Sequence, residues 1–355
     1  MSFSEAGSSL SGSKRHVNIP VFIPHLGCPN DCVFCNQRSI SGKSSFDADK
    51  VSLEIKEALS TLDDVCGENI EIAYFGGSFT GIERPLMIRL LDIAEGFIKD
   101  GRASSIRMST RPDYISREIL DILKNYHVRT IELGIQSMSD EVLRLSKRGH
   151  RTSDTENACG LIKEYGFELI GQMMIGLPGS DIRREVETAE KICGMGASGA
   201  RIYPTMVLCQ TELCEMTKRD EYKPLELDDA IERTSAALRV FIDHGVPVIR
   251  IGLHADESLC DRSGIYAGAY HPAMGELCEN SLYLGLIREK LDELKDEFSP
   301  TSSVVIYVPR GHMSKAVGNK RINAERIRAE YGIKKLHFKE DDGLSPYNVR
   351  ACMGV

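Results

Sequence analysis

The sequence has 355 residues, of which 42% are hydrophobic and 27% charged, a composition typical of a globular protein. This length predicts one large domain or two ordinary ones. The formal net charge of −8 argues against a general attraction to polyanions.

No apolar run approaches the roughly 18–20 residues that a membrane-spanning helix needs. Residues 1–15 are rich in Ser and Gly and lack the continuous apolar stretch of a secretory signal. We therefore expect a flexible N-terminal tail on a soluble, cytoplasmic protein.

From about residue 17 to residue 205, apolar β-branched runs alternate with amphipathic helical stretches. The expected strands are VNIPVFI (17–23), IEIAYF (70–75), SIRMST (105–110), TIELGIQ (130–136), FELIGQMMI (167–175) and ARIYP (200–204). Helices are expected near residues 47–62, 84–99, 116–125, 139–147, 152–165 and 180–193. This alternation predicts right-handed crossovers and a parallel sheet. Because six units are fewer than the eight of a closed barrel, we predict an α/β fold, a partial (β/α)6 TIM-type barrel.

The pattern changes after residue 205. A charged helix (225–244) precedes VPVIRIGLH (246–254), a loop rich in Gly, Tyr and His (262–275), a long helix (276–296) and a β-α-α-β pattern. We divide the chain into a tail (1–15), a main domain (16–300) and a small basic α/β C-terminal domain (301–355). The main domain comprises a core barrel, about 17–205, and an extension, 206–300.

Three cysteines, Cys28, Cys32 and Cys35, follow the first expected strand with the spacing C-x3-C-x2-C. Soft thiolates favour an iron–sulfur cluster or zinc. A structural zinc site normally has four protein ligands, and His25 is a nearby candidate for the fourth. Three cysteines on a 4Fe–4S cluster leave one iron open to a small ligand, which is an enzyme's arrangement.

This spacing, with the aromatic Phe34 directly before the last cysteine, resembles the signature of the radical S-adenosylmethionine (SAM) enzymes. The resemblance implies that the three cysteines hold a 4Fe–4S cluster whose open iron binds SAM. It also implies that an electron, supplied by a flavodoxin or ferredoxin, cleaves SAM to methionine and a 5′-deoxyadenosyl radical. The position of the motif after the first strand of a (β/α) series favours this interpretation.

Other motifs at expected strand ends are similar to SAM-binding segments of that family. In YFGGSFTG, the resemblance assigns the methionine amino group to Gly76, Gly77 and Ser78. In ELGIQSM it assigns the SAM ribose to Gln136, and in SKRGHR it assigns the SAM carboxylate to Arg148. An arginine suits a carboxylate because its donor fork matches two oxygens. Without the resemblance, the glycine pair is consistent with a common turn, and the basic residues of SKRGHR with a solvated surface.

The remaining site candidates also follow expected strands. Thr110 and Arg111 in MSTRPDYI are expected to line the cofactor pocket, although Arg-Pro-Asp also suits a helix start. Gly176 in IGLPGS is expected to flank the adenine. Tyr203 and His271 are the candidate catalytic residues on the substrate side, and packing residues with satisfied polar tips are the alternative.

Several stretches resemble one branch, the radical-SAM domain of the Elongator catalytic subunit and its bacterial relatives. The matching segments include GGSFTG, STRPDY, ELGIQSM, KRGH, GQMMIGLPG, RIYPTMVL and YHPAMGEL. The branch implies action on the wobble uridine of transfer RNA with acetyl-coenzyme A. Elongator subunits have a wider gap between the first two cluster cysteines, and this chain ends without room for their acetyltransferase domain. The branch's full reaction is therefore not carried over to this chain. What remains expected is radical generation, with the substrate still open.

The segment 310–339 is the best indication of the substrate. It contains nine Lys or Arg against two Glu, a local net charge of +7 that leaves −15 for the rest of the chain. Its order resembles the helix-loop-helix of KH domains, which clamp single-stranded nucleic acid at a GxxG loop. Gly318 begins that loop, but Arg321 replaces the second glycine.

We therefore expect a tRNA partner for this segment, and a solvated helical face is the alternative. The residues expected to contact RNA are Lys320, Arg321, Arg326 and Arg328. Two other functions remain open. One is a radical SAM enzyme acting on a small molecule, as relatives of oxygen-independent coproporphyrinogen oxidase do. The other is a non-enzymatic protein with a structural zinc at His25 and the three cysteines.

Overall fold

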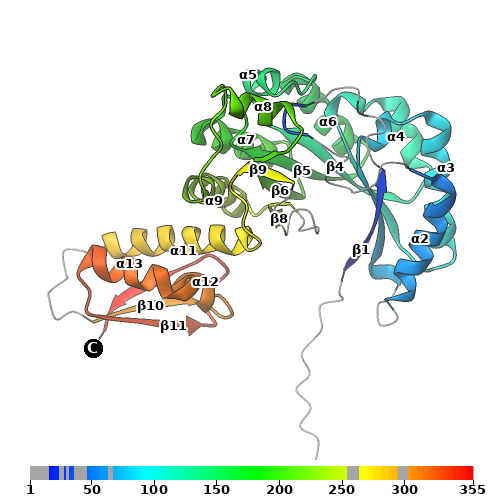
Figure 1. The fold of residues 1–355 in the computed structure, drawn as a ribbon. Helices are drawn as coiled ribbons and strands as arrows, with labels where there is room; N and C mark the ends of the chain where they lie inside the picture. Colours follow the sequence, from blue (N-terminus) through cyan, green and yellow to red (C-terminus); the bar gives the residue numbers. More distant parts are fainter. Residues whose placement is uncertain are drawn as a thin grey trace, which may run out of the picture.

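The computed structural model describes residues 16–23, 28, 32–35, 46–62, 67–253, 264–294 and 303–354. A seven-stranded parallel sheet, curled into a partial barrel, forms the centre of the first part (Figure 1). Its strands, in order across the sheet, are β1 (Val17–Ile23), β2 (Ile70–Gly76), β3 (Ser105–Thr110), β4 (Val128–Gln136), β5 (Glu168–Ile175), β6 (Gly199–Pro204) and β8 (Val248–Ile251). The predicted α/β partial-barrel class is therefore confirmed.

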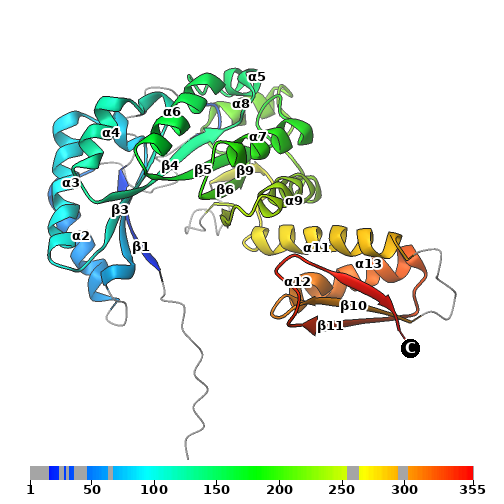
Figure 2. The same ribbon diagram turned by 180° about the vertical axis from the view of Figure 1, so that it is seen from behind.

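Helices cover the convex side of this sheet (Figures 1 and 2). They are α2 (Ala48–Ser60), α3 (Arg84–Lys99), α4 (Arg117–Lys124), α5 (Asp140–Leu145), α6 (Thr152–Glu164), α7 (Ile182–Gly194) and α9 (Leu227–Asp243). Local sequence explains several starts: Ser116 and Asp181 cap α4 and α7 by accepting backbone N–H bonds. A two-stranded sheet of β7 (Met206–Leu208) and β9 (Ile265–Gly268), with α8 (Glu212–Lys218) after β7, follows the barrel.

The sheet is one strand wider than the six predicted. The additional strand, β8, pairs in parallel with β6 in the register Ile202↔Ile251. It has only four residues, and its side chains are half-buried or exposed rather than alternately buried. A strand this short lacks the periodic signal by which the six others were recognised.

The residues 303–354, which we call the C-terminal module, form a smaller α/β unit. Its elements are β10 (Ser303–Pro309), α12 (Met313–Val317), α13 (Ile322–Tyr331), β11 (Lys335–Asp341) and β12 (Arg350–Met353). The sheet order is β11-β10-β12, with β10 parallel to β11 and antiparallel to β12. The helices pack on one face, where Val304, Ile306 and Val308 of β10 are fully buried.

A single helix, α11 (Met274–Asp292), joins the barrel to the C-terminal module (Figure 1). Its first half contributes Met274 and Cys278 to the barrel core. Its second half contributes Ile287 and Leu291 to the core of the module. A 19-residue helix spans about 28 Å. Because one unbroken helix belongs to two cores, it holds the two units at a fixed separation.

The described helices include none long and apolar enough to cross a membrane.

Candidate active site

The cysteine motif lies directly after β1. Cys32 is buried, Cys35 is exposed and Cys28 is partly buried. Cys35 and Cys32 are joined by a turn in which the Cys35 N–H donates to the Cys32 carbonyl at 2.9 Å. His25 lies outside the described residues. Within the described part of the chain, no group of three His, Cys, Asp or Glu side chains is arranged to hold a metal ion.

Val33 anchors the motif to the rest of the barrel. Its N–H donates to the Ser146 carbonyl at 3.2 Å, and its carbonyl accepts from the Leu213 N–H at 2.7 Å. Its side chain is buried with Val207 and Leu213, and the predicted cofactor residue Phe34 packs partly buried against the same cluster. The end of α5 and the start of α8 therefore position Cys32 and Cys35.

Arg148 approaches the cysteines from the segment after β4. Its Nη1 lies 3.4 Å from the Cys32 sulfur and its Nη2 donates to the Gly134 carbonyl at 2.8 Å. Burial raises the pKa of the Cys28 thiol, and the positive charges of Arg148 and Arg111 act against that rise. The Arg148 side chain is thus held against Cys32, one of the predicted cluster ligands.

Arg111 forms the second cationic side of this site. It makes a bidentate pair with Asp113, at 2.9 Å for both bonds, and donates to the Arg148 carbonyl at 2.6 Å. Arg111 Nη1 and Arg148 Nε are buried and have no hydrogen-bond partner among the described residues. Two unsatisfied buried donors beside thiols fit an anionic ligand such as a carboxylate.

Gln136 lies at the end of β4 in a left-handed backbone conformation, with φ of +68°. Its amide exchanges two hydrogen bonds with the Gln172 amide of β5, at 2.8 and 2.9 Å. Gly134 makes room for this arrangement, because a Cβ there would lie 2.8 Å from Arg148 Nη2 and 3.0 Å from Gln136 Nε2. Gln136, predicted to contact the SAM ribose, and Arg148, predicted to contact its carboxylate, therefore both lie next to Gly134.

The glycine pair after β2 is held close to β1. Gly76 has φ of +112°, and a Cβ there would lie 2.6 Å from the Ile23 carbonyl oxygen. The Gly77 N–H donates to that same oxygen at 2.9 Å. A side chain at Gly76 is excluded by both its backbone angle and this contact. The N–H of Gly77 is therefore engaged within the protein, and its carbonyl is the group suited to an ammonium ligand.

Hydroxyl groups join the ends of β2 and β3. The Thr110 hydroxyl lies 2.8 Å from the Ser78 hydroxyl and 2.6 Å from the Thr80 hydroxyl. The Arg111 N–H donates to the Ser78 hydroxyl at 3.2 Å. Ser78 and Thr110 are buried. Their side chains thus brace the strand ends on which the predicted cofactor residues lie.

Gly176, expected beside the adenine, uses both of its polar backbone groups within the protein. Its N–H donates to Glu185 at 2.7 Å, and its carbonyl accepts from the Tyr222 hydroxyl at 2.6 Å. Glu185 is buried and also pairs with Arg233 at 2.5 Å. A cofactor contact at Gly176 is therefore restricted to packing against its surface.

The two candidate catalytic residues lie in different surroundings. Tyr203 on β6 accepts a hydrogen bond from Arg201 at 3.3 Å. Arg201 belongs to a buried chain of ion pairs inside the barrel, Glu71–Arg107–Glu132–Arg201, with contacts of 2.8 to 2.9 Å. His271 instead lines a cavity of about 200 Å³ at the ends of β6 and β8, and Tyr203 is not part of that lining.

Sequence reasoning missed this charged chain, Gln172, and the buried His150. The charged residues of this chain stand within apolar strand sequences, one each in β2, β3, β4 and β6, and that pattern could have revealed the chain of ion pairs. Burial lowers the pKa of His150 to about 4, with the charge of Arg148 acting in the same direction. A single histidine in the sequence gives no comparable signal.

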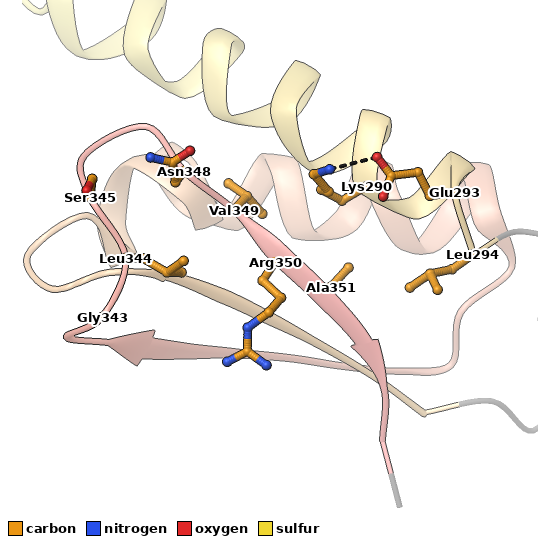
Figure 3. Close-up of a pocket in the computed structure, with 10 residues that line it drawn as sticks. All are labelled: Lys290, Glu293, Leu294, Gly343, Leu344, Ser345, Asn348, Val349, Arg350 and Ala351. Atoms are coloured by element: carbon orange, nitrogen blue, oxygen red, sulfur yellow. Dashed lines mark hydrogen bonds and ion pairs between the residues drawn. The ribbon is translucent and has the colours of Figure 1, made fainter.

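A larger cavity, of about 510 Å³, lies in the C-terminal module between the end of α11 and β12 (Figure 3). Lys290 and Glu293 of its wall pair with each other at 2.7 Å. None of the site residues predicted from the sequence lines this cavity.

Comparison with known proteins agrees with this architecture. A family model described as the Radical SAM superfamily matches residues 22–192, and a Radical_SAM C-terminal domain model matches residues 197–283. A tRNA uridine(34) acetyltransferase of Methanocaldococcus infernus is 37% identical over 139 residues, 38% of this chain and 26% of that protein. The chain thus spans about a quarter of the length of that relative.

Two other relatives cover more of the chain. The uncharacterized protein MJ0486 of Methanocaldococcus jannaschii is 28% identical over 243 residues, 66% of this chain and 73% of that protein. The solved structure of Methanocaldococcus infernus Elp3 with an N-terminal deletion superposes with a TM-score of 0.61 at 26% identity, over 75% of this chain and 62% of that one. The chain belongs to the radical SAM superfamily and is a radical SAM enzyme.

Proposed function

We propose that this enzyme binds a 4Fe–4S cluster through Cys28, Cys32 and Cys35 and uses SAM to modify a base in tRNA. When bound and reduced, the cluster and SAM supply a 5′-deoxyadenosyl radical that takes a hydrogen atom from the substrate. Support comes from the two unsatisfied guanidinium donors beside the cysteines, which fit the SAM carboxylate. Relatives named as tRNA uridine(34) acetyltransferases support the choice of tRNA.

The observation that carries the RNA proposal is a group of unpaired cations in the C-terminal module. Of the nine basic residues between 310 and 339, Arg310 and Lys315 have carboxylate partners, Asp342 and Glu279. The other seven have no ion pair among the described residues: Lys320, Arg321, Arg326, Arg328, Lys334, Lys335 and Lys339. Barrel arginines such as Arg117 are paired, in that case with Glu164 at 2.7 Å. Unpaired cations at this density attract a polyanion.

A groove beside these cations has the lining that an unstacked base requires. It has a volume of about 680 Å³ and lies between α12, Arg321 and the β11 strand. Its walls combine apolar side chains, such as Val317 and Phe338, with the polar His337 and Glu340. Bases splayed from a single strand stack on aromatic and apolar surfaces while cations contact the phosphates. We therefore propose that this groove holds single-stranded RNA.

The loop between α12 and α13 is shaped to present its basic residues. Lys320 and Arg321 both have positive φ, 50° and 65°, and both are exposed. Asn323 supports the loop from inside by donating to the carbonyls of Asn280 on α11 and Ala316 on α12, at 2.8 and 3.2 Å. Because α11 also belongs to the barrel core, RNA held at this loop would lie at a fixed distance from the radical site.

Binding of tRNA at increasing salt tests the proposal. The variant Lys320→Gln, Arg321→Gln, Arg326→Gln removes three exposed, unpaired cations; its matched control replaces the exposed barrel residues Lys56, Lys191 and Lys223 by Gln. We expect the module variant to lower the slope of log affinity against log salt by about 2, at roughly 0.7 for each lost contact. The control is expected to behave as the native protein. Equal salt slopes for the two variants would refute RNA binding here and favour a small-molecule substrate.

A further inference from the structure

The cavity that His271 lines, at the ends of β6 and β8, has a mainly apolar wall that includes a few polar side chains. Pro204 lines it from the end of β6 and Met206 from the start of β7. Arg250 and Gly252 line it from the end of β8, and His271 from the segment before α11. Its volume is about 200 Å³. In parallel α/β sheets, ligands bind at the carboxyl ends of the strands. The cavity therefore lies on the same edge of the sheet as Gly76 and Gln136 but at the opposite end of the strand order from β1.

Arg250 is the unusual residue in this cavity. Its side chain is half-buried, and the one hydrogen bond it makes to a described residue runs from Nε to the Gly252 carbonyl at 3.1 Å. It has no carboxylate partner among the described residues. The adjacent arginine on β6, Arg201, is by contrast paired with Glu132 at 2.9 Å. Removing a guanidinium from water without a counter-charge is costly, so its two terminal nitrogens are suited to an external anion.

His271 supplies a second donor. Its Nδ1 accepts the backbone N–H of Ala273 at 3.1 Å. With Nδ1 used as an acceptor, the proton of the neutral ring is on Nε2, which is then a hydrogen-bond donor. The cavity wall thus contains a guanidinium fork and an imidazole N–H, and none of its lining residues is acidic.

We propose that Arg250 and His271 bind a phosphate group of the nucleotide substrate. This inference rests on the proposed function and extends it by naming the substrate contact inside the barrel. The planar fork of an arginine matches two oxygens of a phosphate, and a neutral imidazole donates to a third. Phosphate contacts position a nucleic acid without reading its sequence. Arg250 would therefore fix the target nucleotide at the edge of the sheet that also carries the predicted SAM residues.

Ligand-observed NMR with uridine 5′-monophosphate and with uridine tests the site. The comparison uses the anaerobically prepared full chain and the variants Arg250→Ala, Arg250→Lys and His271→Gln. The control is Arg183→Ala, an arginine on the surface of α7 with an exposed side chain. We expect the native protein to bind the monophosphate at least about tenfold more tightly than uridine, as loss of one charge-assisted hydrogen bond implies. Arg250→Ala and His271→Gln should reduce this preference, Arg250→Lys should retain part of it, and Arg183→Ala should leave it unchanged.

Equal binding of the monophosphate and uridine, or unchanged preference in a folded Arg250→Ala or His271→Gln variant, would overturn the assignment. Tighter binding of acetate than of inorganic phosphate would overturn the choice of phosphate. An Arg250-dependent preference in a protein that shows no tRNA binding would support this site while refuting the tRNA proposal. Salt-dependent tRNA binding with no phosphate preference in the cavity would refute this site alone.

Discussion

The substitution Gly134→Ala separates the predicted SAM site from the stability of the barrel. A Cβ at this position would lie 2.8 Å from Arg148 Nη2 and 3.0 Å from Gln136 Nε2. Both contacts are with the ends of flexible side chains, so they can move at little cost to the strand. The backbone of Gly134 does not adopt a positive φ. We expect the free energy of unfolding to fall by about 1 kcal/mol, the low end of the range for a methylene added to a core, because the groups that must move are side-chain ends.

The effect on SAM is expected to be larger. Displacing Arg148 would remove the proposed charge-assisted hydrogen bond to the SAM carboxylate, and such a bond contributes about 1.5–3 kcal/mol. This corresponds to an affinity about 10- to 100-fold weaker. Equilibrium dialysis of labelled SAM against the anaerobically reconstituted protein measures the affinity, and urea unfolding measures the stability.

The matched control is Gly96→Ala on α3, where an added Cβ has no heavy atom within 4 Å. Replacing a helical glycine should raise the unfolding free energy by about 0.5–1 kcal/mol and leave SAM binding unchanged. Native SAM affinity in a folded Gly134→Ala variant would refute the assignment of Arg148 and Gln136 to the cofactor.

Three further substitutions test other parts of the account. Glu185→Ala leaves the Gly176 N–H and Arg233 without their buried acceptor, and we expect a loss of about 3–5 kcal/mol in urea unfolding. For His150, the folded-state pKa of about 4 lies below the ordinary value of about 6.5, so its contribution to stability is complete above pH 6.5 and is lost as the pH falls towards 4. Over that window the free energy of unfolding of the native protein should fall by up to about 3 kcal/mol more than that of His150→Phe. Parallel pH profiles of the two proteins would contradict this. Gly318→Ala forces a side chain into a backbone with φ of +80° and against an asparagine 2.8 Å away, so filter binding should show weaker tRNA affinity, and unchanged affinity would contradict the role of the loop.

Much of the fold was predictable because long strands carry a strong periodic signal. The limits of β1 and β3 match the structure to the residue, and the α3 helix does as well. β8 has four residues and β12 follows a loop, so neither carries enough pattern to be recognised. These short strands are defined by their pairing with a longer strand: β8 pairs with β6, and β12 pairs with β10.

Sequence reasoning could propose site residues where a motif stands at or soon after a strand end, as with Gln136 at the end of β4 and Arg148 beyond α5. The partners that hold these residues in place come from distant parts of the chain: Gln172 for Gln136, and the Arg148 carbonyl for Arg111. Contacts between residues so far apart in the chain produce no recognisable residue spacing in the sequence. The same is true of the Arg250 cavity, because its walls come from β6, β8 and the segment before α11.

The most direct test of the central claim is formation of 5′-deoxyadenosine. The protein would be reconstituted anaerobically with iron and sulfide, reduced with dithionite and supplied with SAM. The assay would be run with and without bulk tRNA prepared from cells that lack this protein. We predict product with the native protein, none with alanine at Cys28, Cys32 or Cys35, and more product when tRNA is present. A protein with a full complement of iron and sulfide that yields no 5′-deoxyadenosine under either condition, or one that instead holds a single zinc and no sulfide, would contradict the account.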